Sequence, residues 1–190
     1  MALGKQAKTL TDVQQRAVLA YLDTTMDAKR NRVMFLLSVD AGLRAKEIAL
    51  LEWSMVTDSA GDLTDEIRLE DRSSKGRSGG VVFMSKRLRA ALAVYAADQS
   101  LNGTVIKSQR RRGMSAQVVT NWFFQLYRSL GYEGCSSHSG RRTAITRWAR
   151  SISAVGGSLR DVQALARHSS LQMTQRYIEV SENAMKRVVG

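Results

Sequence analysis

Residues 41–53 read AGLRAKEIALLEW, and their pattern decides the expected fold of the N-terminal half. Three apolar residues of this stretch are expected to face inward: Ile48, Leu50 and Leu51. Gly42 stands where a glycine commonly ends a preceding helix. Arg44 comes where the new helix begins, with Glu47 one turn later. Residues 45–53 are therefore expected to form a helix that presents an arginine at its N-terminal end.

Helices are expected on both sides of this stretch. Upstream, residues 11–21 and 31–39 have apolar positions at helical spacing. Downstream, Ser85 and Ser115 are of a type that commonly caps a helix, and apolar positions at helical spacing follow each of them. Further helices are expected near residues 139–152, 158–167, 171–177 and 182–188. The sequence contains no Pro to interrupt them.

Two short segments between the helices have the pattern of strands. Apolar and polar residues alternate in 66–71, and 81–84 is a short apolar run. The glycine-rich segment 73–80 separates them, as in an antiparallel hairpin. We therefore expect an α+β fold that is mostly α-helical, with one small antiparallel β-sheet.

The chain is strongly basic. It has 29 Lys and Arg against 17 Asp and Glu, a net charge of +12. An excess of this size indicates an anionic partner, most often nucleic acid. No segment approaches the roughly 20 apolar residues of a membrane-spanning helix, so no membrane partner is expected. The one cysteine, Cys135, excludes an internal disulfide and a multi-cysteine zinc site, which favours a reducing cytoplasm.

Residues suited to phosphate chemistry follow one another along the chain: Arg44, Lys75, His138, Arg141, His168 and Tyr177. The guanidinium of an arginine offers a fork of donors to the oxygens of a five-coordinate phosphorus. Two arginines can thereby replace the Mg²⁺ that most phosphoryl-transfer sites use. A histidine can take the proton of an attacking phenol, and a lysine on a loop can protonate the leaving 5′-oxygen. We therefore expect no metal, no ATP and no other cofactor.

The order and local sequence of these residues resemble the tyrosine recombinases, the phage integrase family. The segment AGLRAKEIALL is similar to that family's first arginine box, and KGRSGGVVF to its β-hairpin lysine segment. HSGRRTAITRWA looks like the His-x-x-Arg box, and LARHSSLQMTQRYIEV like the closing segment. The resemblance covers about residues 9–179. It implies the tyrosine-recombinase catalytic-domain fold, which we expect to form one domain over 1–190.

The resemblance also implies a role for each residue. Arg44 and Arg141 would hold the scissile phosphate, with Glu47 orienting the neighbourhood of Arg44. Lys75 would protonate the leaving 5′-oxygen. His138 would act as general base and acid. His168 would donate a hydrogen bond to the phosphate, and Tyr177 would be the nucleophile.

The implied activity is site-specific DNA recombination or integration, by strand cleavage and rejoining through a covalent 3′-phosphotyrosine. The partner would be double-stranded DNA, with the protein a monomer alone, a dimer on each site and a tetramer in the synaptic complex. A bacterial or phage-encoded protein acting at the nucleoid in the cytoplasm is expected. The N-terminal core-binding domain of many family members is expected to be absent from 1–190.

The sequence departs from the family pattern at three places. Ala166-Arg167-His168 stands where Leu-Gly-His is usual, Gly140 replaces a leucine and Phe83 replaces a proline. None of these changes a catalytic residue, so we expect them to alter local packing or DNA affinity.

Other functions remain open from the sequence. A type IB-like topoisomerase would relax DNA without pairing sites, and a regulator of recombinase descent would bind DNA without cutting it. A metal-dependent nuclease would instead bind its metal through an acidic stretch. That stretch comprises Asp58, Asp62, Asp65, Glu66, Glu70 and Asp71. A solvated surface is the simpler interpretation of these residues.

Overall fold

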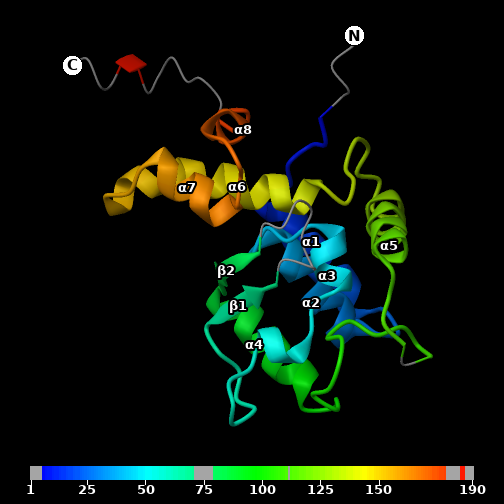
Figure 1. The fold of residues 1–190 in the computed structure, drawn as a ribbon. Helices are drawn as coiled ribbons and strands as arrows, with labels where there is room; N and C mark the ends of the chain where they lie inside the picture. Colours follow the sequence, from blue (N-terminus) through cyan, green and yellow to red (C-terminus); the bar gives the residue numbers. More distant parts are fainter. Residues whose placement is uncertain (1–5, 71–78, 111, 179–184, 187–190) are drawn as a thin grey trace. The chain divides into compact units, whose positions relative to one another are not determined.

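The computed structural model describes residues 6–70, 79–110, 112–178 and 185–186 (Figure 1). The chain divides into two compact units, residues 1–144 and 145–190, with the boundary inside helix α6. The prediction of a single domain over 1–190 stays a prediction. The helix expected near 182–188 falls largely outside the described residues. No helix within the described ranges is long and apolar enough to cross a membrane.

Among its described residues, the first unit contains five helices, a 3₁₀ turn, two strands and the start of a sixth helix. In chain order these are α1 (Asp12–Asp23), α2 (Ala28–Val39), α3 (Ala45–Ala49), a 3₁₀ turn (Trp53–Met55), β1 (Glu66–Leu69), β2 (Gly80–Phe83), α4 (Lys86–Ala96), α5 (Ala116–Ser129) and α6 (Ser139–Ser151). The mostly helical α+β prediction is confirmed.

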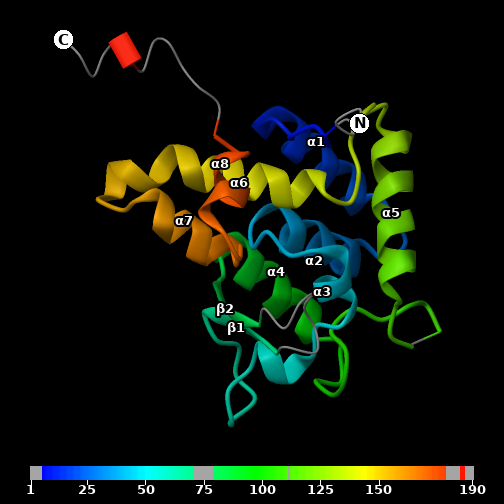
Figure 2. The same cartoon turned by 45° about the horizontal axis from the view of Figure 1, so that its top comes forward.

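Helix α2 lies at the centre of the first unit. Eight of its twelve residues are buried, and it packs against α1, α3 and α4. Helix α3 packs in turn against α5, and both helices are visible in Figure 2. The predicted caps are present, because Ser85 Oγ accepts from the Leu88 N–H and Ser115 Oγ accepts from the Val118 N–H.

The predicted hairpin strands pair antiparallel. Ile67 stands opposite Val82, and both side chains are buried. Leu69 stands opposite Gly80 at the end that leads into the glycine-rich segment. Residues 71–78, which include Lys75 and most of that segment, lie outside the described residues.

One of the three positions expected to face inward in the 41–53 stretch does not. Ile48 and Leu51 are fully buried, whereas Leu50 is 39% exposed. Successive helical residues are about 100° apart, so Leu50 lies about 200° round the helix from Ile48. The helix itself also ends earlier than expected, at Ala49.

The second unit has its own small apolar cluster. The described residues of this unit form the rest of α6, a 3₁₀ turn (Ile152–Val155), α7 (Leu159–Ala166) and α8 (Leu171–Gln175). Ile145, Val162 and Ala166 are fully buried in it. The start of α7 is capped by Ser158, whose backbone N–H donates to the carboxylate of Asp161 and lowers its pKa. This cluster forms the base on which the C-terminal candidate residues lie.

Candidate active site

Arg44 is held in place by Glu47. The backbone N–H of Arg44 donates to Glu47 Oε2 and its Nη1 donates to Oε1, each at 2.8 Å. The Glu47 side chain is fully buried, while that of Arg44 is 25% exposed. One carboxylate therefore caps α3 and orients the guanidinium, leaving part of the guanidinium accessible to a ligand.

Arg141 meets the same segment from a distant part of the sequence. It lies in the first turn of α6 and is buried, and its Nη1 donates to the carbonyl oxygen of Gly42 at 2.5 Å. The two residues are 99 positions apart. Gly42 has φ +64°, a conformation that glycine adopts without strain. Because Gly42 precedes Arg44 by two residues, the fold brings both candidate phosphate-binding arginines to one short segment.

His138 lies on the turn that leads into α6. Its backbone N–H donates to Ser136 Oγ at 3.3 Å, and its carbonyl accepts from the Arg142 N–H at 2.9 Å. The residue is exposed. His138 thus stands in the same unit as Arg44 and Arg141, with an imidazole that solvent or a ligand can reach.

Asp40 was missed by the sequence reasoning, and it anchors the segment that carries Gly42 and Arg44. Its buried carboxylate accepts from Arg87 Nε and from Ser85 Oγ, both at 2.6 Å. Its hydrogen bond to Arg87 raises the pKa of that guanidinium. No periodic pattern signals this contact, because 47 positions separate Asp40 from Arg87.

The start of α6 also depends on a close approach to α2. A Cβ added to Gly140 would lie 2.8 Å from the Cβ of Ser38 and 3.1 Å from its carbonyl carbon. Ser38 is fully buried. The glycine that replaces the family's leucine therefore matches a helix contact that admits no side chain.

Gly140→Ala is expected to lower the free energy of unfolding by about 1–3 kcal/mol, because the added methyl overpacks this contact. Urea unfolding of the variant and wild type measures the change. Ser38→Gly alone should cost about 1 kcal/mol, as glycine in a helix does. Combined with Gly140→Ala, Ser38→Gly should make room for the methyl. The double variant should therefore lose less stability than the two single variants lose together. Additive losses would contradict the contact.

In the second unit, His168 and Tyr177 lie together. Their rings stack with centroids 5.4 Å apart and an interplanar angle of 25°. His168 Nδ1 shares a hydrogen bond of 2.9 Å with the hydroxyl of Thr174, which is fully buried. Tyr177 is partly buried against the Ile145 cluster. The Thr174 hydroxyl, which carried no recognisable sequence signal, thus fixes the ring on which Tyr177 rests.

Arg167, where the resemblance expects glycine, adopts the left-handed conformation with φ 51° and ψ 47°. It ends α7, and His168 follows it directly. A non-glycine residue in this region costs on the order of 1 kcal/mol. The backbone turn that glycine favours is therefore kept despite the arginine side chain.

The described part of the acidic stretch forms no metal-binding cluster. No group of three or more His, Cys, Asp or Glu side chains that could hold a metal ion occurs among the described residues, which exclude Asp71. Asp58 instead accepts from the backbone N–H groups of Ala60 and Asp62, as in a local turn. The acidic stretch thus gives no support to the nuclease reading.

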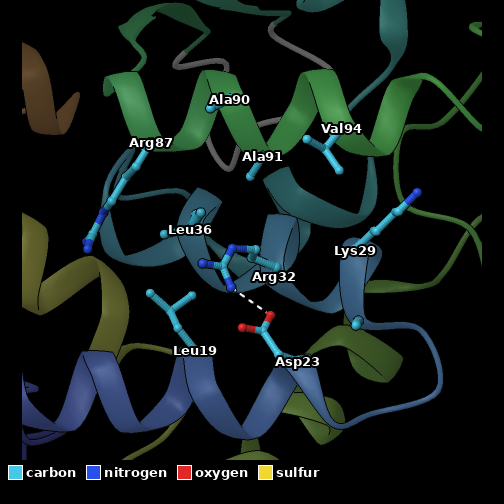
Figure 3. Close-up of a pocket in the computed structure, with 10 residues that line it drawn as sticks. Leu19, Asp23, Lys29, Arg32, Leu36, Arg87, Ala90, Ala91 and Val94 are labelled. Atoms are coloured by element: carbon cyan, nitrogen blue, oxygen red, sulfur yellow. Dashed lines mark hydrogen bonds and ion pairs between the residues drawn. The ribbon is translucent and has the colours of Figure 1, made fainter.

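A cavity of about 480 Å³ lies between α1, α2 and α4 (Figure 3). Leu36 and Ala91 contribute to its apolar lining, and Arg32 Nη1 reaches Asp23 Oδ1 at 2.7 Å. None of the described candidate residues lines it. The cavity is therefore separate from the Arg44 and Arg141 segment.

Comparisons with known proteins agree with this arrangement. The sequence pattern of the phage integrase family matches residues 8–184. The tyrosine recombinase XerA of Thermococcus onnurineus (strain NA1) is 26% identical over 183 residues, which are 95% of this chain. The chain spans 61% of the length of that relative.

Solved structures show the same fold. The Tn1549 transposon integrase in complex with a circular intermediate DNA matches with a TM-score of 0.74 and 14% identity, over 98% of this chain and 66% of that chain. The XerH site-specific recombinase bound to its difH substrate matches with a TM-score of 0.72 and 18% identity, over 100% of this chain and 55% of that chain. The predicted catalytic-domain fold is confirmed. Because the family pattern covers nearly all of its sequence, this chain belongs to the phage integrase family.

Proposed function

We propose that this chain cuts a DNA strand by attack of Tyr177 on the scissile phosphate and rejoins it through a covalent 3′-phosphotyrosine. The reaction serves site-specific recombination or integration. The hydrogen bond from Arg141 to Gly42 is the observation that carries the proposal most directly. It gathers two arginines on one segment, as the binding of two non-bridging phosphate oxygens requires.

The arginine pair supplies charge stabilisation in this mechanism. Phosphoryl transfer depends mainly on positioning and on neutralising the charge of the equatorial oxygens. Glu47 keeps the Arg44 guanidinium in one orientation, and the Gly42 carbonyl does the same for Arg141. Preorganised donors of this kind cost little reorganisation when the transition state forms.

The C-terminal pair supplies the nucleophile. Tyr177 Oη forms the new bond to phosphorus as the bond to the 5′-oxygen breaks, and its proton passes to His138. Lys75 gives a proton to the 5′-oxygen. His168, held through Nδ1 by Thr174, donates from Nε2 to a phosphate oxygen. The phosphotyrosine conserves the energy of the broken ester, so attack by a 5′-hydroxyl religates the strand without ATP.

The partner we propose is double-stranded DNA. Both structures named above were determined with DNA, and this chain carries a net charge of +12. Recombination joins two duplexes, so we propose a monomer in isolation, a dimer on each site and a tetramer in the synaptic complex. We further propose that the protein acts in the cytoplasm on bacterial or phage DNA.

The test is the trapping of a covalent adduct in EDTA. A pool of nicked duplexes of randomised sequence lets the short 5′-hydroxyl fragment diffuse away after cleavage, so religation fails. We expect a protein–DNA band that survives denaturation and that peptide mapping locates at Tyr177. No adduct from the whole pool would favour a binding-only regulator, and a metal requirement would overturn the mechanism.

Recombinase and topoisomerase activity differ after cleavage. Both form the adduct, but only a recombinase exchanges strands between two duplexes. Once the pool has yielded a cleaved sequence, two labelled duplexes carrying it are expected to give recombinant products. Relaxation of supercoiled DNA without any recombinant product would favour the topoisomerase.

Lys75→Ala is expected to slow cleavage of an ordinary phosphodiester by about 10²–10⁴-fold, the usual contribution of a general acid. A substrate with sulfur in place of the bridging 5′-oxygen needs no proton on its leaving group. Single-turnover rates on that substrate should be restored to near the wild-type rate. Equal slowing on both substrates would remove Lys75 from the acid role.

A further inference from the structure

The segment between α4 and α5 contains a closed basic turn. Lys107 and Gly113 form an antiparallel bridge, and the Ser108 N–H donates to the Arg112 carbonyl at 2.7 Å. Arg110 and Arg112 are exposed on this turn. Arg111, between them, lies outside the described residues and carries no part of the argument.

The basic turn is anchored to the core at its base. Val105 and Ile106, which precede it, are fully buried. Arg30 Nη1 donates to the Lys107 carbonyl at 3.2 Å, and Lys107 Nζ donates to the Asn102 carbonyl at 3.1 Å. The turn is therefore held in position before any ligand arrives, which lowers the entropic cost of binding.

The charges on the basic turn are not neutralised locally. Residues 101–132 contain five Lys and Arg and no Asp or Glu. Arg30, Arg32 and other arginines of this unit form ion pairs with carboxylates. No acidic side chain of the described residues forms an ion pair with Arg110 or Arg112.

The first turn of α5 adds to this field. Ser115 caps the helix directly after the basic turn, and no acidic residue follows in its first turn. A helix N-terminus carries a partial positive charge that favours an anion. The turn and the helix end thus present positive charge side by side.

The basic turn precedes α5 in the chain, and the residues that lead to His138 and Arg141 follow α5. Helix α5 runs between the turn and the chain leading to His138 and Arg141 (Figure 1). Its 14 residues span about 21 Å.

We infer that Arg110 and Arg112 form a second binding site, for the phosphate backbone of DNA away from the cleaved bond. The inference rests on the proposed function only in taking DNA as the ligand. Guanidinium groups on a fixed turn bind phosphate oxygens without reading bases, so the site adds affinity at any sequence. Each phosphate contact releases counterions, which makes its contribution visible in the salt dependence of binding.

The test compares two double variants of the full chain that lose the same charge. Arg110→Gln with Arg112→Gln removes the proposed site. Arg16→Gln with Arg89→Gln removes two other exposed arginines, one on α1 and one on α4. Binding to an unnicked random-sequence duplex is measured across a salt series.

We expect the Arg110 and Arg112 double variant to lower the slope of log affinity against log salt by about 2, since each phosphate contact contributes about 0.9. Arg110→Lys with Arg112→Lys should keep most of the slope, because charge suffices for this contact. The Arg16 and Arg89 control should change the slope by less than about 1. An equal change in both glutamine variants would overturn the inference.

Adduct formation by the wild type, measured in parallel, separates the two proposals. An adduct together with an unchanged slope in the Arg110 and Arg112 glutamine variant overturns this inference and leaves the function standing. A reduced slope without any adduct supports the inference and overturns the cleavage chemistry.

Discussion

Tyr177→Phe is expected to abolish the covalent adduct with DNA, a loss of about 10³-fold or more, as when the attacking group of a covalent mechanism is removed. The ring should remain where it is, because its stacking on His168 and its packing against the Ile145 cluster involve the aromatic face. The free energy of unfolding should therefore change by less than about 0.5 kcal/mol. Adduct yield on nicked duplexes and urea unfolding give the two quantities.

Tyr21→Phe is the matched control for this variant. Tyr21 is 37% exposed on α1 and has no proposed role, so its variant should form the adduct at the wild-type rate. An adduct of undiminished yield with Tyr177→Phe would mean that another residue attacks, and peptide mapping would identify it.

Arg141→Lys is expected to slow adduct formation at saturating DNA by about 10²–10³-fold, the usual loss on removing one preorganised donor to a transition-state oxyanion. Lysine keeps the charge but lacks the planar fork that can bind Gly42 with one nitrogen and phosphate with another. The affinity for uncleaved DNA should fall far less, because a single charge contributes modestly to it. Single-turnover rates and equilibrium binding separate the two effects.

Arg142→Lys is the control for this second variant. Arg142 is the next residue of α6, and its Nη1 also donates to a backbone carbonyl, that of Ala7 at 3.0 Å. It has no place in the proposed mechanism, so its cleavage rate should stay within about threefold of wild type. If both substitutions slowed cleavage equally, the loss would reflect the stability of α6 rather than phosphate binding.

The local parts of the active site could be predicted from the sequence. Arg44 and Glu47 are three residues apart, and helical geometry alone brings such a pair together. The serine caps could be predicted for the same reason, because a cap depends on residues within one turn. The prediction that Leu50 faces inward was wrong, although helical geometry alone places it about 200° from the buried Ile48.

The packing around α6 could not be read from the sequence. Gly140 looked like a departure from the family pattern, and only its distance from Ser38 explains why a side chain is excluded there. Thr174 belongs to no motif in the sequence, and only the fold shows that its hydroxyl contacts His168.

The amino-acid sequence is enough to identify the residues for the chemistry, their order, and the contacts that one helical turn creates. The tertiary structure decided where the 41–53 stretch is held. Asp40 meets Arg87 across 47 positions, and Arg141 meets Gly42 across 99. Such contacts depend on the packing of whole helices around a common core, which the spacing of residues along the chain does not specify.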